Sequence, residues 1–177
     1  MAHVMTTDDA AETFASPNAF ALNDDQQAMF EEANRFARNE LYPLAERMDN
    51  EEWWPEDVFD TIGEMGYFGL TVPEEYGGQG LDFFTSGLVS QAFGRWNHAL
   101  ALSWVAHENL CLNNIYRNAN EALRHKYLPS LCAGKSIGAL GLTEPGAGSD
   151  ALGAMSTTAR RNGDRYILNG RKMFITN

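Results

Sequence analysis

Apolar residues recur at steps of three and four along the first third of the chain. This spacing places them on one face of a helix, and so predicts a long amphipathic helix that begins near Asn23. Asn23 suits the capping position, because its side-chain oxygen can accept a bond from the first turn. Pro43 should kink or divide the helix, since proline lacks a backbone donor. The apolar stripe consists of Phe30, Ala33, Ala37, Leu41, Leu44 and Met48.

The same periodicity predicts further helices up to residue 135. Their approximate ranges are 55–65, 83–96, 100–117 and 120–131. The run PEEYGGQG at 73–80 is rich in proline and glycine, which predicts a loop.

From Ser136 the helical spacing is replaced by short apolar runs. SIGALGLT at 136–143 predicts a buried strand. STTARRNGDRYILNGRKMFITN at 156–177 predicts two antiparallel strands around Asn162-Gly163-Asp164, with a second turn at Asn169-Gly170. We therefore expect an α+β chain with a disordered tail (1–22), an all-α domain (23–135) and the beginning of an incomplete antiparallel β domain (136–177).

Charge and composition exclude several classes of protein. The net charge of −11 is concentrated early: residues 1–60 hold 15 acidic and 3 basic side chains. Such an acidic surface is opposed to nucleic-acid binding. No apolar run is long enough to predict a membrane span. The first twenty residues lack a signal core and contain no arginine, so we expect a cytoplasmic protein.

The cysteine and histidine pattern does not predict a metal site. Cys111 and Cys132 lie in apolar helical stretches, which is typical of buried free thiols in a reducing compartment. Together with His107 and His125 they could be considered as metal ligands. Their spacing matches no zinc motif, so no metal is expected.

The stretch LTEPGAGSD at 142–150 has the composition of a ligand-binding loop. Gly146 and Gly148 let backbone amides approach a ligand, while Thr143 and Ser149 add hydroxyl groups. A structural glycine loop is the plain alternative. Gly146 and Gly148, followed by Ala151, also match the dinucleotide fingerprint, but the residues that follow are too few and too β-branched for its crossover helix.

Four blocks of sequence carry a resemblance to a known family. They are PEEYGGQG (73–80), NEALRHKYLPSL (120–131), LTEPGAGSD (142–150) and NGRKMFITN (169–177). With these blocks the chain resembles the acyl-CoA dehydrogenase family from about Leu22 to its last residue. The resemblance implies a helical domain, a β domain and a second helical bundle, with FAD between the last two. On this basis we expect an acyl-CoA dehydrogenase-like fold that is truncated before its active site is complete.

The resemblance also implies which residues contact the flavin. The segment Leu140–Ser149 would run along the ring, and Ser149 would also lie near coenzyme A. Phe174 stands where many members have tryptophan and would cover one flavin face, while the Thr176 hydroxyl would point toward N5. Such donors stabilise the charge that develops on a reduced flavin. The cofactor residues implied are Leu140, Gly141, Leu142, Thr143, Gly148, Ser149, Phe174, Ile175 and Thr176.

The stretch 104–118 looks closest to the isovaleryl-CoA dehydrogenase branch of the family. The match places Leu102 and Ala106 in the acyl pocket, although residues at this spacing also suit a plain core. It implies oxidation of a short, branched acyl-CoA to the trans-2-enoyl-CoA in leucine or fatty acid catabolism. Electron-transfer flavoprotein would accept the electrons, and the protein would be a homotetramer.

No catalytic base is expected within the chain. The family supplies a glutamate from a later helical domain, beyond Asn177, and Glu144 is interpreted as structural because it lies before Pro145 in the cofactor loop. The segment by itself should therefore be inactive. The alternatives are a non-catalytic helical interaction module and an acyl-CoA oxidase.

Overall fold

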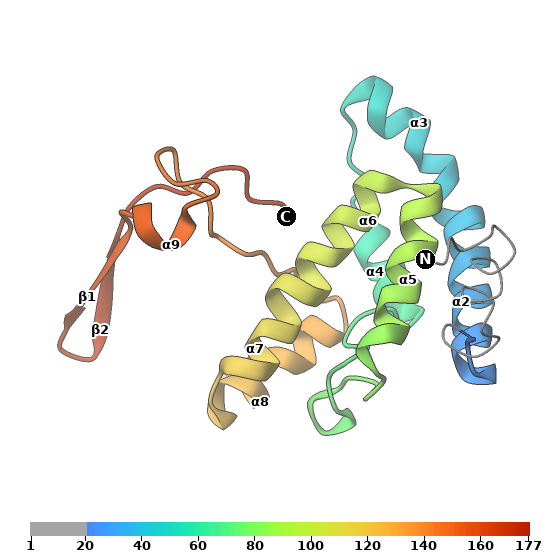
Figure 1. Ribbon diagram of the computed structural model, residues 1–177, viewed down its shortest axis with the longest axis horizontal. Helices are drawn as coiled ribbons and strands as arrows, with labels where there is room; N and C mark the ends of the chain where they lie inside the picture. Colours follow the sequence, from blue (N-terminus) through green and yellow to red (C-terminus); the bar gives the residue numbers. More distant parts are fainter. Residues whose placement is uncertain (1–20) are drawn as a thin grey trace, which may run out of the picture.

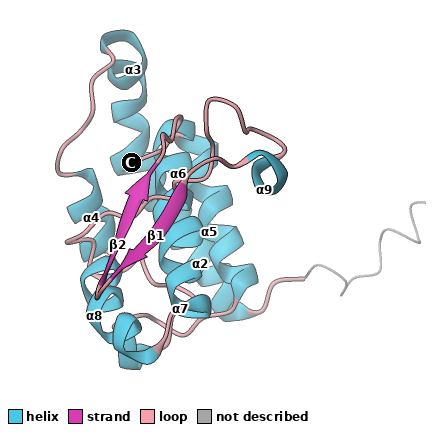
Figure 2. Cartoon of the chain, turned by 90° about the vertical axis from the view of Figure 1, so that its left-hand side faces the viewer, coloured by secondary structure: helices cyan, strands magenta, loops and turns pink. Residues whose placement is uncertain are grey.

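The computed structural model describes residues 21–177 (Figure 1). The tail expected for residues 1–22 lies outside the described residues except for its last two positions. In the described part, helices precede residue 136, and a pair of strands follows it (Figure 2). None of the helices in this part is long and apolar enough to cross a bilayer.

The first predicted helix is present and contains a π-helical stretch just before the proline. Helix α2 (Asp24–Phe36) begins with a capping box: the Asn23 side chain accepts from the Gln26 amide at 2.8 Å, and the Gln26 side chain accepts from the Asn23 amide at 3.2 Å. A π-helical stretch η1 (Ala37–Leu41) follows, and Pro43 lies in the first turn of α3 (Tyr42–Glu51). Proline is tolerated there because first-turn amides need no partner within the helix. The helical run continues through Pro43 without a break, and the expected disturbance takes the form of the π-helical stretch just before it.

The remaining helices agree closely with the predicted ranges. They are α4 (Val58–Glu64), the 3-10 turn η2 (Glu74–Tyr76), α5 (Phe83–Trp96), α6 (His98–Val105), the π-helix η3 (Ala106–Leu112), α7 (Asn113–Asn118) and α8 (Glu121–Cys132). The helix expected over 100–117 is therefore one helical run with a π-helical centre. A π-helical stretch adds one residue to a single turn of the helix. This change is too local for the apolar spacing of the sequence to reveal it.

The main core lies where α2, α5 and α6 pack together. Four rings form a chain of aromatic contacts: Phe36 to Tyr67 (5.2 Å between centroids), Tyr67 to Phe93 (5.3 Å) and Phe93 to Trp104 (5.5 Å). The Trp104 indole also donates to the Tyr67 carbonyl oxygen at 2.7 Å, which satisfies its buried N–H. The helical part thus has a core of its own. The predicted stripe contributes to it, with Ala33, Ala37 and Leu41 buried and Phe30, Leu44 and Met48 partly buried.

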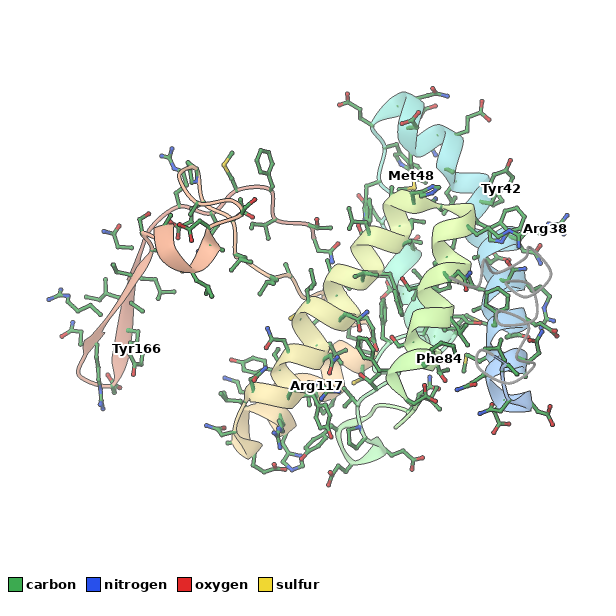
Figure 3. All side chains as sticks on the ribbon, viewed as in Figure 1. Arg38, Tyr42, Met48, Phe84, Arg117 and Tyr166 are labelled. Carbon is green, nitrogen blue, oxygen red and sulfur yellow. The ribbon has the colours of Figure 1, made fainter. Side chains whose placement is uncertain are left out.

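The end of the chain forms a hairpin rather than a closed sheet. Strands β1 (Thr158–Asn162) and β2 (Arg165–Asn169) pair antiparallel, with Thr158 opposite Asn169. Gly163 adopts φ 65° in the tight turn between them, a conformation that favours glycine. Both strands are exposed along their length, and Tyr166 projects from the hairpin at a distance from the helices (Figure 3). The predicted hairpin is confirmed.

Two details of residues 136–157 differ from expectation. The buried strand predicted for 136–143 is wrong, because these residues have no regular structure and Leu142 is exposed. A strand is held by a series of backbone bonds to a neighbouring strand. Within the described residues, the stretch has one backbone bond of this kind, from the Met173 amide to the Thr143 carbonyl oxygen. A helical turn, α9 (Ala151–Ala154), interrupts the expected run of strands. At four residues it is far too short for the crossover helix of a dinucleotide fold.

Candidate functional site

The two segments singled out by their sequence lie side by side. The Met173 amide donates to the Thr143 carbonyl oxygen at 3.0 Å, and the Lys172 ammonium donates to the Leu142 carbonyl oxygen at 3.1 Å. Both segments run through the irregular region between the hairpin and the helical body (Figure 1). Residues 140–149 and 174–176 therefore belong to one local structure, although about thirty positions separate them.

A buried carboxylate fastens this region together. One oxygen of Glu144 accepts from both the amide (2.7 Å) and the hydroxyl (2.6 Å) of Ser156. The other accepts from the Thr157 amide at 3.0 Å and the Lys172 ammonium at 2.8 Å. The Lys172 ammonium, with these other donors, holds the pKa of the Glu144 carboxyl well below its usual range. Glu144 is thus a fixed anion that links three stretches of chain.

Several backbone donors of the loop are free to meet a ligand. Glu144 and Ala147 exchange two backbone bonds (3.0 and 3.1 Å) that close the Pro145-Gly146 turn. Within residues 21–177 the amides of Gly141, Leu142 and Thr143 make no backbone hydrogen bond. Polar groups left unpaired near the surface of a fixed loop are suited to binding an acceptor-rich ligand.

An apolar ring accompanies these donors. Phe174 is 84% exposed and has φ 56°, which is uncommon for a bulky side chain and is found where surroundings or function impose it. Thr143 and Thr176 are partly buried, while Gly148 and Ser149 are exposed. Amide donors, hydroxyl groups and an exposed aromatic ring are the groups that a planar, polar-edged cofactor such as a flavin requires. The residues present therefore fit that group.

The second segment ends against helix α6. The Asn177 side-chain amide donates to the Ser103 carbonyl oxygen at 2.9 Å and to the Gly138 carbonyl oxygen at 3.2 Å. The Gly138 amide in turn donates to Nδ1 of His107 at 2.9 Å. Sequence reasoning considered His107 only as a metal ligand and gave Asn177 no role. The glycine that interrupts the apolar run at 138 was the available signal, since it marks a close backbone approach.

The two predicted acyl-pocket residues occupy different environments. Leu102 is 60% exposed and lines a hollow of about 630 Å³ between α3 and the beginning of α6. Met48 lies beside the amino-terminal end of α6, where it helps to line this hollow (Figure 3). Ala106 is 2% exposed and does not line the hollow. The other residues that line the hollow are Ala45, Asp49, Glu52, Trp53, Trp54, Asn97, His98, Ala99 and Ser103.

The histidine and thiol groups do not form a metal centre. Among residues 21–177 no group of three His, Cys, Asp or Glu side chains is placed to hold a metal ion. Cys111 and Cys132 are free thiols, and burial raises the pKa of both, that of Cys132 to about 12. Neither thiol is prepared for nucleophilic chemistry, because the thiolate is the reactive form.

Comparison with known families identifies the class of protein. Residues 23–135 match the model for the acyl-CoA dehydrogenase N-terminal domain, and residues 139–177 match the model for the acyl-CoA dehydrogenase middle domain. Together the two models cover most of the chain. The chain belongs to the acyl-CoA dehydrogenase family.

Individual relatives agree with this assignment. The chain is 42% identical over 168 residues to the mitochondrial isovaleryl-CoA dehydrogenase of Arabidopsis thaliana, covering 93% of this chain and 41% of that protein. A solved chain described as electron transferring flavoprotein of Acidaminococcus fermentans is 40% identical, with a TM-score of 0.84 over 88% of this chain and 41% of its own. A glutaryl-CoA dehydrogenase from Mycobacterium smegmatis, in complex with FADH2, is 30% identical, with a TM-score of 0.83 over 93% and 42%. The chain thus spans about two fifths of the length of these relatives.

Proposed function

We propose that the chain is the amino-terminal part of an FAD-dependent dehydrogenase that oxidises a short, branched acyl-CoA to its trans-2-enoyl-CoA. The observation that carries this proposal is the bond from Met173 to Thr143, which joins the two segments expected at the flavin. The fit of these segments to a flavin and the FADH2 complex of a relative support FAD as the cofactor.

The described residues account for binding rather than for the proton transfer. FAD would accept the hydride, while the Thr143 hydroxyl and the amides of Gly141 and Leu142 donate to its polar edge. Phe174 would cover one face of the ring and exclude water there. The Thr176 hydroxyl would donate near the reacting nitrogen, and Ser149 would lie toward coenzyme A. The Glu144 carboxylate is committed to four donors, so we assign the catalytic base to a later part of the protein.

The branched substrate is supported by one relative and one side chain. The Arabidopsis relative is named for isovaleryl-CoA, and Leu102 presents an apolar surface to an open hollow. An apolar wall at this place would favour a short hydrocarbon tail over a charged one such as that of glutaryl-CoA. Electron-transfer flavoprotein is the proposed electron acceptor and a homotetramer the proposed assembly. The two free thiols are consistent with the cytoplasm as the proposed compartment.

The visible spectrum of the full-length protein tests this function. The purified protein should be yellow, and isovaleryl-CoA should bleach it anaerobically faster than glutaryl-CoA does. A colourless protein, or one that neither thioester bleaches, would contradict the proposal and favour a non-catalytic helical module. Rapid reoxidation by air, with no need for electron-transfer flavoprotein, would indicate an oxidase instead.

A pair of leucine variants tests the acyl pocket. Leu102→Thr should reduce the preference for isovaleryl-CoA by about tenfold, because it replaces an apolar wall with a polar one. Leu110 is also exposed on the same helical run but does not line the hollow, so Leu110→Thr is the matched control. Equal effects of the two substitutions would count against Leu102 as a pocket residue.

A further inference from the structure

His107 is buried in the first turn of helix η3, and both of its ring nitrogens are hydrogen-bonded. Its side chain is 0% exposed, and the ring lies edge-on to Phe68 at 4.4 Å between centroids. Nε2 lies 3.1 Å from the Leu131 carbonyl oxygen, and Nδ1 accepts from the Gly138 amide at 2.9 Å. A carbonyl can only accept and an amide can only donate, so the ring is neutral with its proton on Nε2.

The backbone at Gly138 docks directly on this helix. A Cβ atom at position 138 would lie 2.3 Å from Sγ of Cys111 and 2.7 Å from its Cβ. His107 and Cys111 therefore both adjoin the segment that leads into the cofactor loop. This approach is possible only without a side chain at position 138.

Gly138 also receives the second cofactor segment. Its carbonyl oxygen accepts from the Asn177 side chain at 3.2 Å, and Asn177 directly follows Thr176. Gly138 is itself two residues before Leu140, where the first cofactor segment begins. Gly138 thus links His107 to both segments. Its amide is bonded to His107, and its carbonyl oxygen is bonded to Asn177.

We propose that His107 is a positioning residue, which holds Gly138 by its amide and so sets the place of both flavin-contacting segments relative to the helical domain. This inference rests on the proposed function, because it assigns those segments to the flavin. His107 contacts neither cofactor nor substrate and acts through Gly138 and Asn177. Burial lowers the pKa of the imidazole, which keeps Nδ1 available as an acceptor at neutral pH.

Two substitutions separate the two bonds of the imidazole. An asparagine side chain reaches the position of Nδ1, so His107→Asn retains an acceptor for Gly138 and loses the bond to Leu131. A glutamine side chain reaches the position of Nε2, so His107→Gln retains the donor to Leu131 and leaves the Gly138 amide unpaired. Each variant loses one buried bond, so their melting temperatures should fall by similar amounts.

Hydrogen exchange and FAD affinity in the full-length protein give the decisive comparison. His107→Gln should speed exchange of the Gly138 amide by about tenfold and weaken FAD binding by about tenfold. His107→Asn should leave both within about threefold of the unmodified protein. Equal effects of the two variants, or no effect of either, would overturn the proposal.

A substitution at the exposed residue Asn177 tests the proposal even if His107→Gln does not fold. Asn177→Ala removes, from an exposed residue, the side-chain donor to the carbonyl oxygens of Gly138 and Ser103, so it should weaken FAD binding about threefold while it changes the melting temperature little. Asn114→Ala, at an exposed position of α7, is the matched control and should change neither value. Unchanged FAD affinity in Asn177→Ala would overturn the role of the Gly138 junction. If the unmodified protein binds no FAD, the proposed function fails, while the exchange comparison still decides whether His107 holds Gly138.

Discussion

The Lys172 ammonium lies 2.8 Å from a carboxylate oxygen of Glu144, across 28 positions of sequence. The Glu144 side chain is 1% exposed and that of Lys172 is 25% exposed, so the carboxylate is shielded and the ammonium covers its outer side. The same ammonium donates to the Leu142 carbonyl oxygen. One side chain therefore holds both the anion and the backbone of the cofactor loop.

Removal of this ammonium should raise the pKa of Glu144. In Lys172→Met the carboxyl loses its strongest stabilising partner, but Ser156 and Thr157 still donate, so its pKa should rise and stay below its ordinary 4.5. Because folding lowers the pKa of Glu144, its ionised carboxylate stabilises the folded state above pH 4.5. This contribution is lost as the pH falls below 4.5. The variant should therefore lose less stability on acidification. Carboxyl NMR titration measures the shift. Arg171→Met, at the exposed neighbouring position, is the control, and an equal shift there would contradict the assignment.

Replacement of Thr176 tests the contact near the reacting nitrogen. In the full-length protein, Thr176→Ala should slow flavin reduction by substrate about tenfold or more, while FAD remains bound, because a donor to the developing charge is lost. Anaerobic stopped-flow absorbance measures this rate. An unchanged rate would show that Thr176 does not contact the reacting part of the ring. Thr158→Ala, in the exposed strand β1, provides the comparison.

Replacement of Ser149 tests the contact on the coenzyme A side. Ser149→Ala should raise the Michaelis constant more than it lowers the turnover number, since an interaction with the carrier is present in both ground and transition states. Steady-state kinetics with electron-transfer flavoprotein separate the two constants. If turnover and the specificity constant fall equally, Ser149 acts in the transition state and the proposed position is wrong. Ser156→Ala is unsuitable as a control, because that hydroxyl bonds Glu144.

Glu108 should make stability depend on pH in the opposite direction. This side chain is 0% exposed and accepts from the amides of Gly69 (2.7 Å) and Leu70 (2.8 Å). Burial raises the pKa of its carboxyl from 4.5 to about 7. The folded protein therefore binds this proton more tightly than the unfolded chain does. Its contribution is full below pH 4.5 and is lost as the pH rises to about 7, a change of about 3 kcal/mol.

The variant Glu108→Gln isolates that contribution. Glutamine presents one oxygen to two amides, so the variant should be about 1–3 kcal/mol less stable at low pH. Between about pH 5 and pH 8 it should lose less stability than the unmodified protein. Urea unfolding of the full-length protein measures both values. The lowered pKa of His107 makes the stability fall as the pH drops below 6.5, but this effect is the same in the variant and in the unmodified protein. Identical pH profiles would contradict a raised pKa at Glu108.

The sequence predicted those features that depend on neighbouring residues. The cap at Asn23 and the turn at Gly163 each follow from local bonding, and both are present. The apolar stripe of the first helix faces the core, because residues three and four positions apart lie on the same side of a helix. The strand predicted at 136–143 failed, because a strand also requires a partner that sequence spacing does not specify.

The polar contacts of the site were less predictable. Glu108 and His107 adjoin each other in the sequence, yet one holds the Gly69 turn and the other holds Gly138. Each bond joins residues at least thirty positions apart, and a single sequence does not encode which amide will face a given side chain. The motifs led to the proposed ligand of the cofactor loop. They did not show that Glu144, Asn177 and His107 hold it in place.

The two cysteine sulfur atoms of the chain are each covered by a residue that has no side chain. Gly138 lies over Cys111, and a Cβ at Gly69 would lie 2.6 Å from Sγ of Cys132. An oxidant or alkylating reagent would have to displace backbone to reach either sulfur along these directions. The raised pKa of each thiol also keeps it protonated and slow to react. The covering of both thiols therefore depends on two glycines, because a side chain at either position would collide with the sulfur beneath it.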